Sequence, residues 1–247
     1  MDKLAVSGFL LALLAVAGGF VIEGGSLATL LHFPAFLIVV GGTLGAVMLQ
    51  TPLSQFTLGL KMLPWVVRPA HLPLGNTVER IVHWGTAARS TGFLALEADA
   101  LSEQDPFLHR GLNLLVDGVE PKVLQDTLDA ELTLERERLL RGARIFDAMG
   151  GYSPTIGIVG AVLGLIQAMA NISEPEQLGL GIATAFVATI YGVGFANLIF
   201  IPVGNKLKSL VHQRTLYHEL IVEGLVSIAH GENPRNIERK LAAYHSG

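Results

Sequence analysis

Long stretches without a charged residue are the feature that most constrains the fold of this chain. A helix needs about 20 residues to cross a hydrocarbon core of about 30 Å. Four stretches free of Asp, Glu, Lys and Arg meet that requirement: Leu4–Ile22, Gly24–Leu60, Ala148–Ser173 and Gln177–Asn205, and the second span fits at about Leu27–Leu49. The sequence therefore predicts four transmembrane helices.

The composition favours a membrane protein over the alternative, a soluble protein with unusually apolar buried helices. The 247 residues are 51% hydrophobic and 15% charged, which is a poor fit to a soluble globule. The net charge of −4 and the absence of a dense basic run exclude a nucleic-acid-binding protein. The absence of cysteine excludes disulfides, thiolate catalysis and cysteine-ligated metals. A cleaved signal peptide is disfavoured, because no A-x-A site follows the first stretch and another span comes at once.

The positions of the basic residues predict the orientation. Lys3 precedes the first span, ten Lys and Arg residues lie between spans two and three, and six follow span four. Because basic residues mark the cytoplasmic side, both termini and the middle segment are expected there. The segments Glu23–Ser26 and Asn171–Leu178 are then short outer turns.

The predicted fold is an all-α integral membrane protein with four transmembrane helices, a helical cytoplasmic domain between the second and third, and a cytoplasmic helical tail. Residues 1–50 form a hairpin with spans at about 4–22 and 27–49, and residues 51–151 form the cytoplasmic domain. Residues 152–203 form a second hairpin with spans at about 152–171 and 179–203, and residues 204–247 form the tail.

Capping signals support a helical cytoplasmic part. Asn76 with Glu79 resembles a capping box, while Asp105 and Glu120 each precede a proline, as residues before a helix start do. The Asp117-Gly118 pair is expected to end the helix that begins at Pro106.

Two long helices are expected to leave the membrane. Charges at helical spacing from Lys122 onward predict a helix that runs into span three, and span four is expected to continue to His230. Gly231 and Asn233-Pro234 then end that helix and start a short terminal one.

Small residues recur three and four positions apart in spans three and four. They are Gly157, Gly160, Ala161, Gly164 and Ala168, and Gly181, Ala185, Ala188, Gly192 and Ala196. Such faces allow close helix approach in lipid and favour a partner helix, although packing within one chain is the alternative. Thr155, Thr184 and Thr189 either bond back to their own helices or line a wet path.

The spans contain no Asp, Glu, Lys or Arg, so this chain alone has no obvious proton relay, and a partner must supply any carboxylate. Two prolines lie near the same membrane depth. Pro154 is either a first-turn proline or a bend, whereas Pro202 lies within a helix that is expected to continue and to bend there. Together they predict a hinge plane, with passive kinks as the alternative.

Five sequence blocks in this order resemble the A-type stator subunits of the bacterial flagellar motor, the MotA and PomA family. They are ARSTGFLALE (88–97), GLNLLVDG (111–118), GYSPTIGIVGAVLGLIQAM (151–169), AFVATIYGVGFANLIFIP (185–202) and GENPRNIERKL (231–241). The resemblance covers nearly the whole chain.

The resemblance implies a torque generator of the bacterial inner membrane, not an enzyme. It implies about five A chains around two B chains, each B chain contributing one membrane helix with an ion-binding Asp. It also implies a rotor switch-complex protein as partner, and no cofactor besides the transported ion. Spans three and four would line the ion path, with Thr155, Gly157, Gly160, Ala161, Gly164, Ala185, Ala188 and Thr189 as the path residues.

The resemblance also assigns coupling roles. Pro154 and Pro202 match the prolines that link ion passage to movement of the cytoplasmic part, and Arg89 and Glu97 match the pair that engages the rotor. Without the resemblance, such a pair reads as solvated surface. Ser90 and Ala98 depart from the pattern, because many members carry further charges there.

The ion is predicted to be a proton. Sodium-driven members carry Thr at the position matched by Ala161, and a methyl group supplies no oxygen to a dehydrating Na⁺. Thr189 matches a Thr that both classes keep.

Three alternatives remain open. The related TolQ and ExbB energy transducers have three spans and lack the N-terminal hairpin. A solute transporter would show discontinuous helices in paired halves and polar groups at mid-membrane, and neither is found here. A structural scaffold without ion transport is the third.

Overall fold

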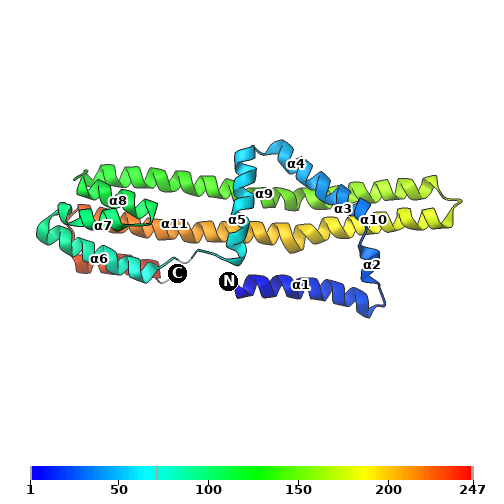
Figure 1. Ribbon diagram of the computed structural model, residues 1–247, viewed down its shortest axis with the longest axis horizontal. Helices are drawn as coiled ribbons and strands as arrows, with labels where there is room; N and C mark the ends of the chain where they lie inside the picture. The colour runs from blue at the N-terminus through cyan, green and yellow to red at the C-terminus, as the bar shows by residue number, and fades with distance from the viewer. Residues whose placement is uncertain (1, 71, 246–247) are drawn as a thin grey trace. The chain divides into compact units, whose positions relative to one another are not determined.

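The computed structural model describes residues 2–70 and 72–245, and every regular element within them is a helix (Figure 1). Four helices are long and apolar enough to cross a membrane: Lys3–Ile22, Phe33–Gln50, Pro121–Ala170 and Pro175–Ala229. The all-helical membrane fold is thereby confirmed. The chain divides into two compact units: unit 1 comprises Met1–Pro69 and Arg138–Leu210, and unit 2 comprises Ala70–Glu137 and Val211–Gly247.

Unit 1 contains the apolar helices. Its N-terminal elements are α1 (Lys3–Ile22), α2 (Leu27–Leu30), α3 (Phe33–Phe36), the π-helical segment η1 (Leu37–Gly41), α4 (Gly42–Gln50) and α5 (Leu53–Val67). The remainder comprises parts of α9 (Pro121–Ala170) and α11 (Ile201–Ala229), together with α10 (Pro175–Phe195) and the π-helical segment η3 (Ala196–Phe200).

The second membrane helix begins later than predicted. The expected span from residue 27 is interrupted after Leu30, and the helix that continues to Gln50 starts at Phe33. His32 caps it by accepting a hydrogen bond from the Ala35 backbone N–H, and Pro34 occupies the first turn. Proline has no N–H and its ring obstructs the preceding turn, so it suits a helix start better than a helix interior.

Two helices run through both units. α9 is continuous from Pro121 to Ala170, which confirms one helix from the inner segment into span three. Pro154 therefore lies in a helix interior, not in a first turn. Span four continues through η3 and α11 to Ala229, which confirms the predicted continuation past Pro202.

Unit 2 is a separate helical bundle. It contains α6 (Leu74–Thr91), the 3₁₀ segment η2 (Phe93–Leu96), α7 (Glu97–Ser102), α8 (Pro106–Val116), α12 (Pro234–Leu241), the 3₁₀ segment η4 (Ala242–His245) and parts of α9 and α11. Its core is built on large buried side chains, among them Ile81, Trp84, Leu112, Leu128 and Leu220. Because α11 contributes to this core, residues 211–245 belong to the same compact unit as the middle of the chain.

Most predicted helix ends in unit 2 are confirmed. The Asp105 carboxylate accepts from the Phe107 backbone N–H at 2.9 Å and caps α8, which ends before Asp117. Asn233 caps α12 in the same way through the Arg235 backbone N–H. The capping box at Asn76 is wrong, because α6 already begins at Leu74, and Asn76 lies inside its first turn.

Candidate functional site

The small residues of spans three and four pack α9 against α10 within this chain. A Cβ added to Gly164 would lie 2.6 Å from the Ala185 backbone N and 2.7 Å from the Gly181 carbonyl oxygen. One added to Gly157 would lie 3.0 Å from the Ala188 carbonyl oxygen and from the Gly192 Cα. The two backbones are therefore close to the minimum separation, and only small residues fit between them. This corrects the expectation that the face awaits a helix from another chain.

Five of the eight residues predicted to line an ion path lie in this contact. They are Gly157, Gly160, Gly164, Ala185 and Ala188, and all five are buried. A residue closed off by the neighbouring helix of its own chain offers no lining surface. The remaining three residues stay accessible: Thr155 and Thr189 are exposed, and Ala161 is half-buried.

The threonine hydroxyls bond back to their own helices. Thr155 donates to the Tyr152 carbonyl at 2.8 Å, and Thr189 donates to the Ala185 carbonyl at 3.1 Å. Each donor is thus occupied, while the oxygen keeps an acceptor lone pair for a passing water. Both exposed threonines therefore retain one hydrogen-bond acceptor at the surface of their helices.

The two prolines lie where α9 and α11 pack closely. A Cβ on Gly150, one turn before Pro154, would lie 2.6 Å from Ile201, the residue directly before Pro202. In an α-helix the N–H of residue 154 would donate to the Gly150 carbonyl, and proline removes that bond. The missing backbone hydrogen bond of α9 therefore lies next to Ile201, the residue that precedes Pro202.

The segment before Pro202 adds a second irregularity. The five residues Ala196–Phe200 are π-helical, with one more residue per hydrogen-bonded turn than an α-helix. π-Segments and prolines are the usual physical causes of helix bends. Just beyond them, Lys208 Nζ donates to both Asp147 carboxylate oxygens, at 3.0 and 3.1 Å, which ties α11 to α9.

A buried hydroxyl directly before Pro154 was not predicted from the sequence. Ser153 is fully buried directly before Pro154, and its Oγ has no hydrogen-bond partner among the residues that the structure describes. Thr43 Oγ1 in α4 is also buried without a hydrogen-bond partner among the described residues. An unsatisfied buried hydroxyl costs about 1 to 3 kcal/mol. Serine is common in membrane helices for packing alone, so the sequence contained no signal for this feature.

A polar network joins the break before α3 to α10. The Tyr191 hydroxyl donates to the Leu30 carbonyl and accepts from the His32 backbone N–H at 3.3 Å. His32 Nε2 also lies 3.3 Å from Thr184 Oγ1. The side chains of α10 thus satisfy backbone groups that the break leaves without helical partners, as a membrane environment demands. The histidine at an outer boundary was the only sequence signal for this network.

The predicted rotor pair lies on the surface of unit 2. Arg89 is in the last turn of α6, Glu97 begins α7, and Gly92 separates them with a φ of 87°, a backbone conformation that favours glycine. Both charged side chains are exposed. Across residues 2–70 and 72–245, neither forms an ion pair. Both side chains are therefore accessible from outside unit 2.

Polar contacts join elements of unit 2, the unit that carries this pair. The Arg80 guanidinium pairs with the Glu103 carboxylate and lies 4.8 Å from the centre of the Trp84 ring. Burial raises the pKa of Glu103, but hydrogen bonds from the Asp105 backbone N–H and from Arg80 outweigh it and hold the pKa below its ordinary value. Tyr217 and Thr77 share a buried hydrogen bond of 3.0 Å.

Two protein families match this chain. Residues 99–219 match the MotA/TolQ/ExbB proton channel family, and residues 6–79 match the motility protein A N-terminal family. The first match defines the class, a membrane protein of the ion-channel type shared by MotA, TolQ and ExbB. The second match covers the N-terminal hairpin, and it separates this chain from the TolQ and ExbB alternative.

Individual relatives match along nearly their whole length. Motility protein A of Bacillus subtilis is 34% identical over 99% of this chain and 91% of its own length, and chemotaxis protein PomA of Vibrio alginolyticus is 32% identical over 95% and 94%. Among solved structures, MotAB of C. jejuni matches with a TM-score of 0.94 at 30% identity, covering 100% of this chain and 98% of that one. The flagellar MotAB stator complex of Bacillus subtilis matches with a TM-score of 0.89 at 34% identity, covering 98% and 96%.

The chain belongs to the MotA/PomA family of flagellar-motor stator subunits. This is a family of channel and stator proteins and not a family of enzymes. The identification agrees with the family resemblance of the five sequence blocks.

Proposed function

We propose that this chain assembles with a B-type partner into a proton channel that converts ion flow into torque on the flagellar rotor. One observation carries the proposal: the four charge-free spans hold no acid of their own in a chain whose fold matches a MotAB complex at a TM-score of 0.94. The partner's single membrane helix supplies the ion-binding Asp. No cofactor is needed besides the transported proton.

The hairpin of α9 and α10 has apolar surface left for such neighbours. Side chains that point away from the small-residue contact are strongly exposed, among them Ile158, Val162, Ile166, Phe186 and Ile190. In our proposal about five A chains surround two B helices, and part of this surface faces the neighbouring chains while the rest faces lipid. Thr155, Ala161 and Thr189 then line the path beside the partner's Asp, whereas the five buried small residues hold the hairpin closed.

The accessible residue Ala161 favours a proton over Na⁺ as the transported ion. Ala161 contributes a methyl group, and a dehydrated Na⁺ requires several oxygen ligands. One charge that crosses 100 mV releases about 2.3 kcal/mol, so a few protons suffice for a mechanical step. Motility that stops on removal of sodium, yet survives a protonophore at matched voltage, contradicts this assignment.

Coupling runs through the prolines and the surface pair. We infer that a change in the partner's charge bends α9 and α11 at Pro154 and Pro202, where the missing backbone hydrogen bonds lower the cost of bending. The exposed Arg89 and Glu97 then engage complementary charges on a rotor switch-complex protein. Both termini and this surface lie in the cytoplasm, and the spans lie in the bacterial inner membrane, as the basic residues indicate.

The decisive experiment compares this chain alone with the pair of A and B chains in liposomes under a pH gradient. We expect proton flux only from the pair, and flux that disappears when the partner's Asp is replaced by Asn. Equal flux from this chain alone refutes the proposal.

Variants separate coupling from assembly. We expect Pro154→Ala and Pro202→Ala to insert and assemble but to abolish torque, and normal swimming of both variants contradicts the hinge. Reversing Arg89 or Glu97 should reduce motility without loss of assembly, and a matching reversal on the rotor should restore part of it. Ser90→Ala, beside Arg89 and equally exposed, is the matched control.

A further inference from the structure

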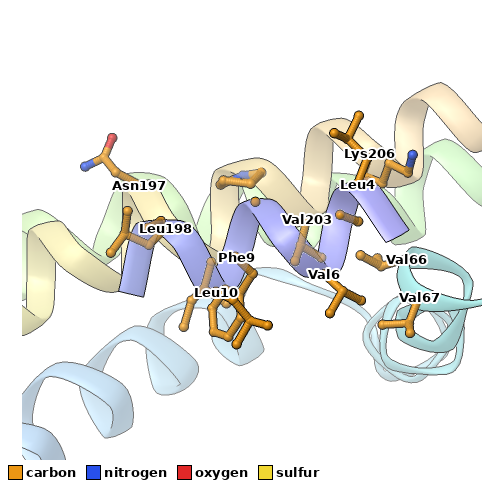
Figure 2. A pocket seen from close by; sticks show the side chains of 15 residues that line it. Leu4, Val6, Phe9, Leu10, Val66, Val67, Asn197, Leu198, Val203 and Lys206 are labelled. Carbon is orange, nitrogen blue, oxygen red and sulfur yellow. The ribbon is translucent and has the colours of Figure 1, made fainter. Parts of the chain in front are cut away.

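A cavity of about 540 Å³ lies in unit 1 between the start of α1, the end of α5 and the segment that contains η3 and Pro202 (Figure 2). Leu4, Phe9, Val67 and Leu198 are among the apolar side chains that line it. The volume falls in the range of about 300 to 1,000 Å³ typical of ligand pockets. The groove is therefore large enough for a flexible apolar ligand.

The groove opens to the outside of the chain on the side of α1. No residue of α1 is buried, and Leu4, Phe9 and Leu10 are 80%, 46% and 50% exposed. Gly8 lines the groove, and a Cβ added there would meet no atom within 4 Å. In a membrane protein, an open apolar groove between spans faces the acyl chains of lipids.

One end of the groove is closed and charged. Asp2 caps α1, its backbone N–H donates to the Val67 carbonyl at 2.8 Å, and its carboxylate accepts from Lys206 Nζ. This hydrogen bond from Lys206 holds the pKa of Asp2 below its ordinary value. A single residue thus ties the three walls together, and Figure 2 shows Lys206 and Leu4 at the same end as Val66 and Val67.

Two further basic residues adjoin lining residues of the groove in the sequence. Lys3 directly precedes the lining residue Leu4, and Arg68 directly follows the lining residue Val67. Both are exposed, and neither has an ion-pair partner in the part of the chain that the structure describes. Lys206, which pairs with the Asp2 carboxylate, also lines the groove. Trp65 lies three residues from Arg68, and tryptophan favours the depth of the lipid headgroups.

We propose that this groove binds an anionic phospholipid, with one acyl chain along α1 and the phosphate beside Lys3, Arg68 and Lys206. Basic pockets between membrane helices are sites for anionic headgroups, and the apolar walls continue from that charged end. The bound acyl chain also contacts Pro202, which forms part of the wall. The site belongs to this chain alone and does not depend on the proposed torque function.

The test uses the full chain in phosphatidylcholine nanodiscs, with trace phosphatidylglycerol or phosphatidylcholine that carries a diazirine on one acyl chain. After photolysis, mass spectrometry locates the adducts. We expect phosphatidylglycerol to label residues 4–12 and 197–203 more strongly than phosphatidylcholine does. Replacing Lys3 or Arg68 by Gln should lower this preference about fivefold, as expected for one cation near an anionic headgroup. Lys61→Gln, an exposed cation outside the groove, should leave it unchanged.

The second part of the experiment fills the groove with a side chain of the protein itself. Gly8→Leu places a side chain in the open space and should remove most of the labelling. Gly19→Leu is the matched control, because Gly19 is on the same helix, three turns away, and also has no atom within 4 Å of an added Cβ. The surface variants at Lys3 and Arg68 keep the test valid if Gly8→Leu does not fold.

Two outcomes overturn the proposal. Equal labelling by the two lipids means that the groove merely touches bulk lipid. Exclusion of both lipids, together with cross-linking between copies through Ala12→Cys, means that a second copy of the chain covers the groove. The chain has no native cysteine, so such a cross-link reports only the introduced thiol.

Discussion

Gly164→Ala is the sharpest test of the contact between α9 and α10. The added Cβ would lie 2.6 Å from the Ala185 backbone N and 3.0 Å from the Ala185 Cα. These are backbone atoms, which cannot rotate away as a flexible side chain does. The helices must therefore separate by roughly 0.8 Å before ordinary van der Waals contact returns.

The expected magnitude follows from two opposing effects. A gap of about 0.5 to 1 Å forfeits a quarter to a half of the attraction between facing atoms, and overpacking typically costs about 1 to 3 kcal/mol. Alanine also stabilises a helix over glycine by about 0.5 to 1 kcal/mol. We expect Gly164→Ala to lower the free energy of unfolding by about 1 to 2 kcal/mol.

Gly194→Ala is the matched control, because an added Cβ there meets no atom within 4 Å. It should raise the free energy of unfolding by about 0.5 kcal/mol. The measurement is equilibrium unfolding of the full chain in mixed micelles, followed by circular dichroism. The double variant Gly164→Ala with Gly181→Ala should cost less than the sum of its parts, since one separation relieves both overlaps. Equal stability of Gly164→Ala and Gly194→Ala refutes this account of the packing.

Three further predictions concern polar contacts. Glu103 has a lowered pKa in the folded chain, so its contribution to stability is present above the unfolded value of 4.5 and is lost as pH falls through the folded pKa; Glu103→Gln should flatten the acid limb of unfolding measured against pH. Arg80→Ala should cost roughly 2 kcal/mol, less than a fully buried pair because Arg80 is partly exposed; an unchanged denaturation midpoint rules out this role. Tyr191→Phe should cost about 1 kcal/mol through the lost bond to the Leu30 carbonyl, measured as SDS-induced unfolding against Phe186→Leu as an exposed control.

Local signals in the sequence predicted most of the elements. Asp105 and Asn233 cap helices because the oxygen of a short polar side chain can accept a hydrogen bond from a free backbone N–H of the first turn. The proline that follows each of them marks the start of the helix. The four apolar spans followed from length and charge alone. By contrast, the break at Leu31 and His32 interrupts a long stretch without charged residues. Only the proline two residues later marked the true start of the helix.

The sequence predicted only part of the candidate site. The periodicity of glycine and alanine correctly identified a close-packing face, but not the helix that packs against it. The accessible residues Thr155, Ala161 and Thr189 were predicted together with five residues that the structure buries. The network around Tyr191 and the unpartnered hydroxyl of Ser153 escaped notice because each depends on segments that are distant in the chain.

The amino-acid sequence by itself determined that this chain enters a membrane four times, that its spans carry no acid, and that its cations gather on one side. These properties depend on the free energy of transferring each side chain from water to lipid, and the order of residues along the chain fixes that energy. Tertiary structure decided which neighbour meets the glycine face, and it created the groove beside α1. In lipid every apolar surface has nearly the same affinity for its surroundings, so shape and close packing, not hydropathy, select the contact.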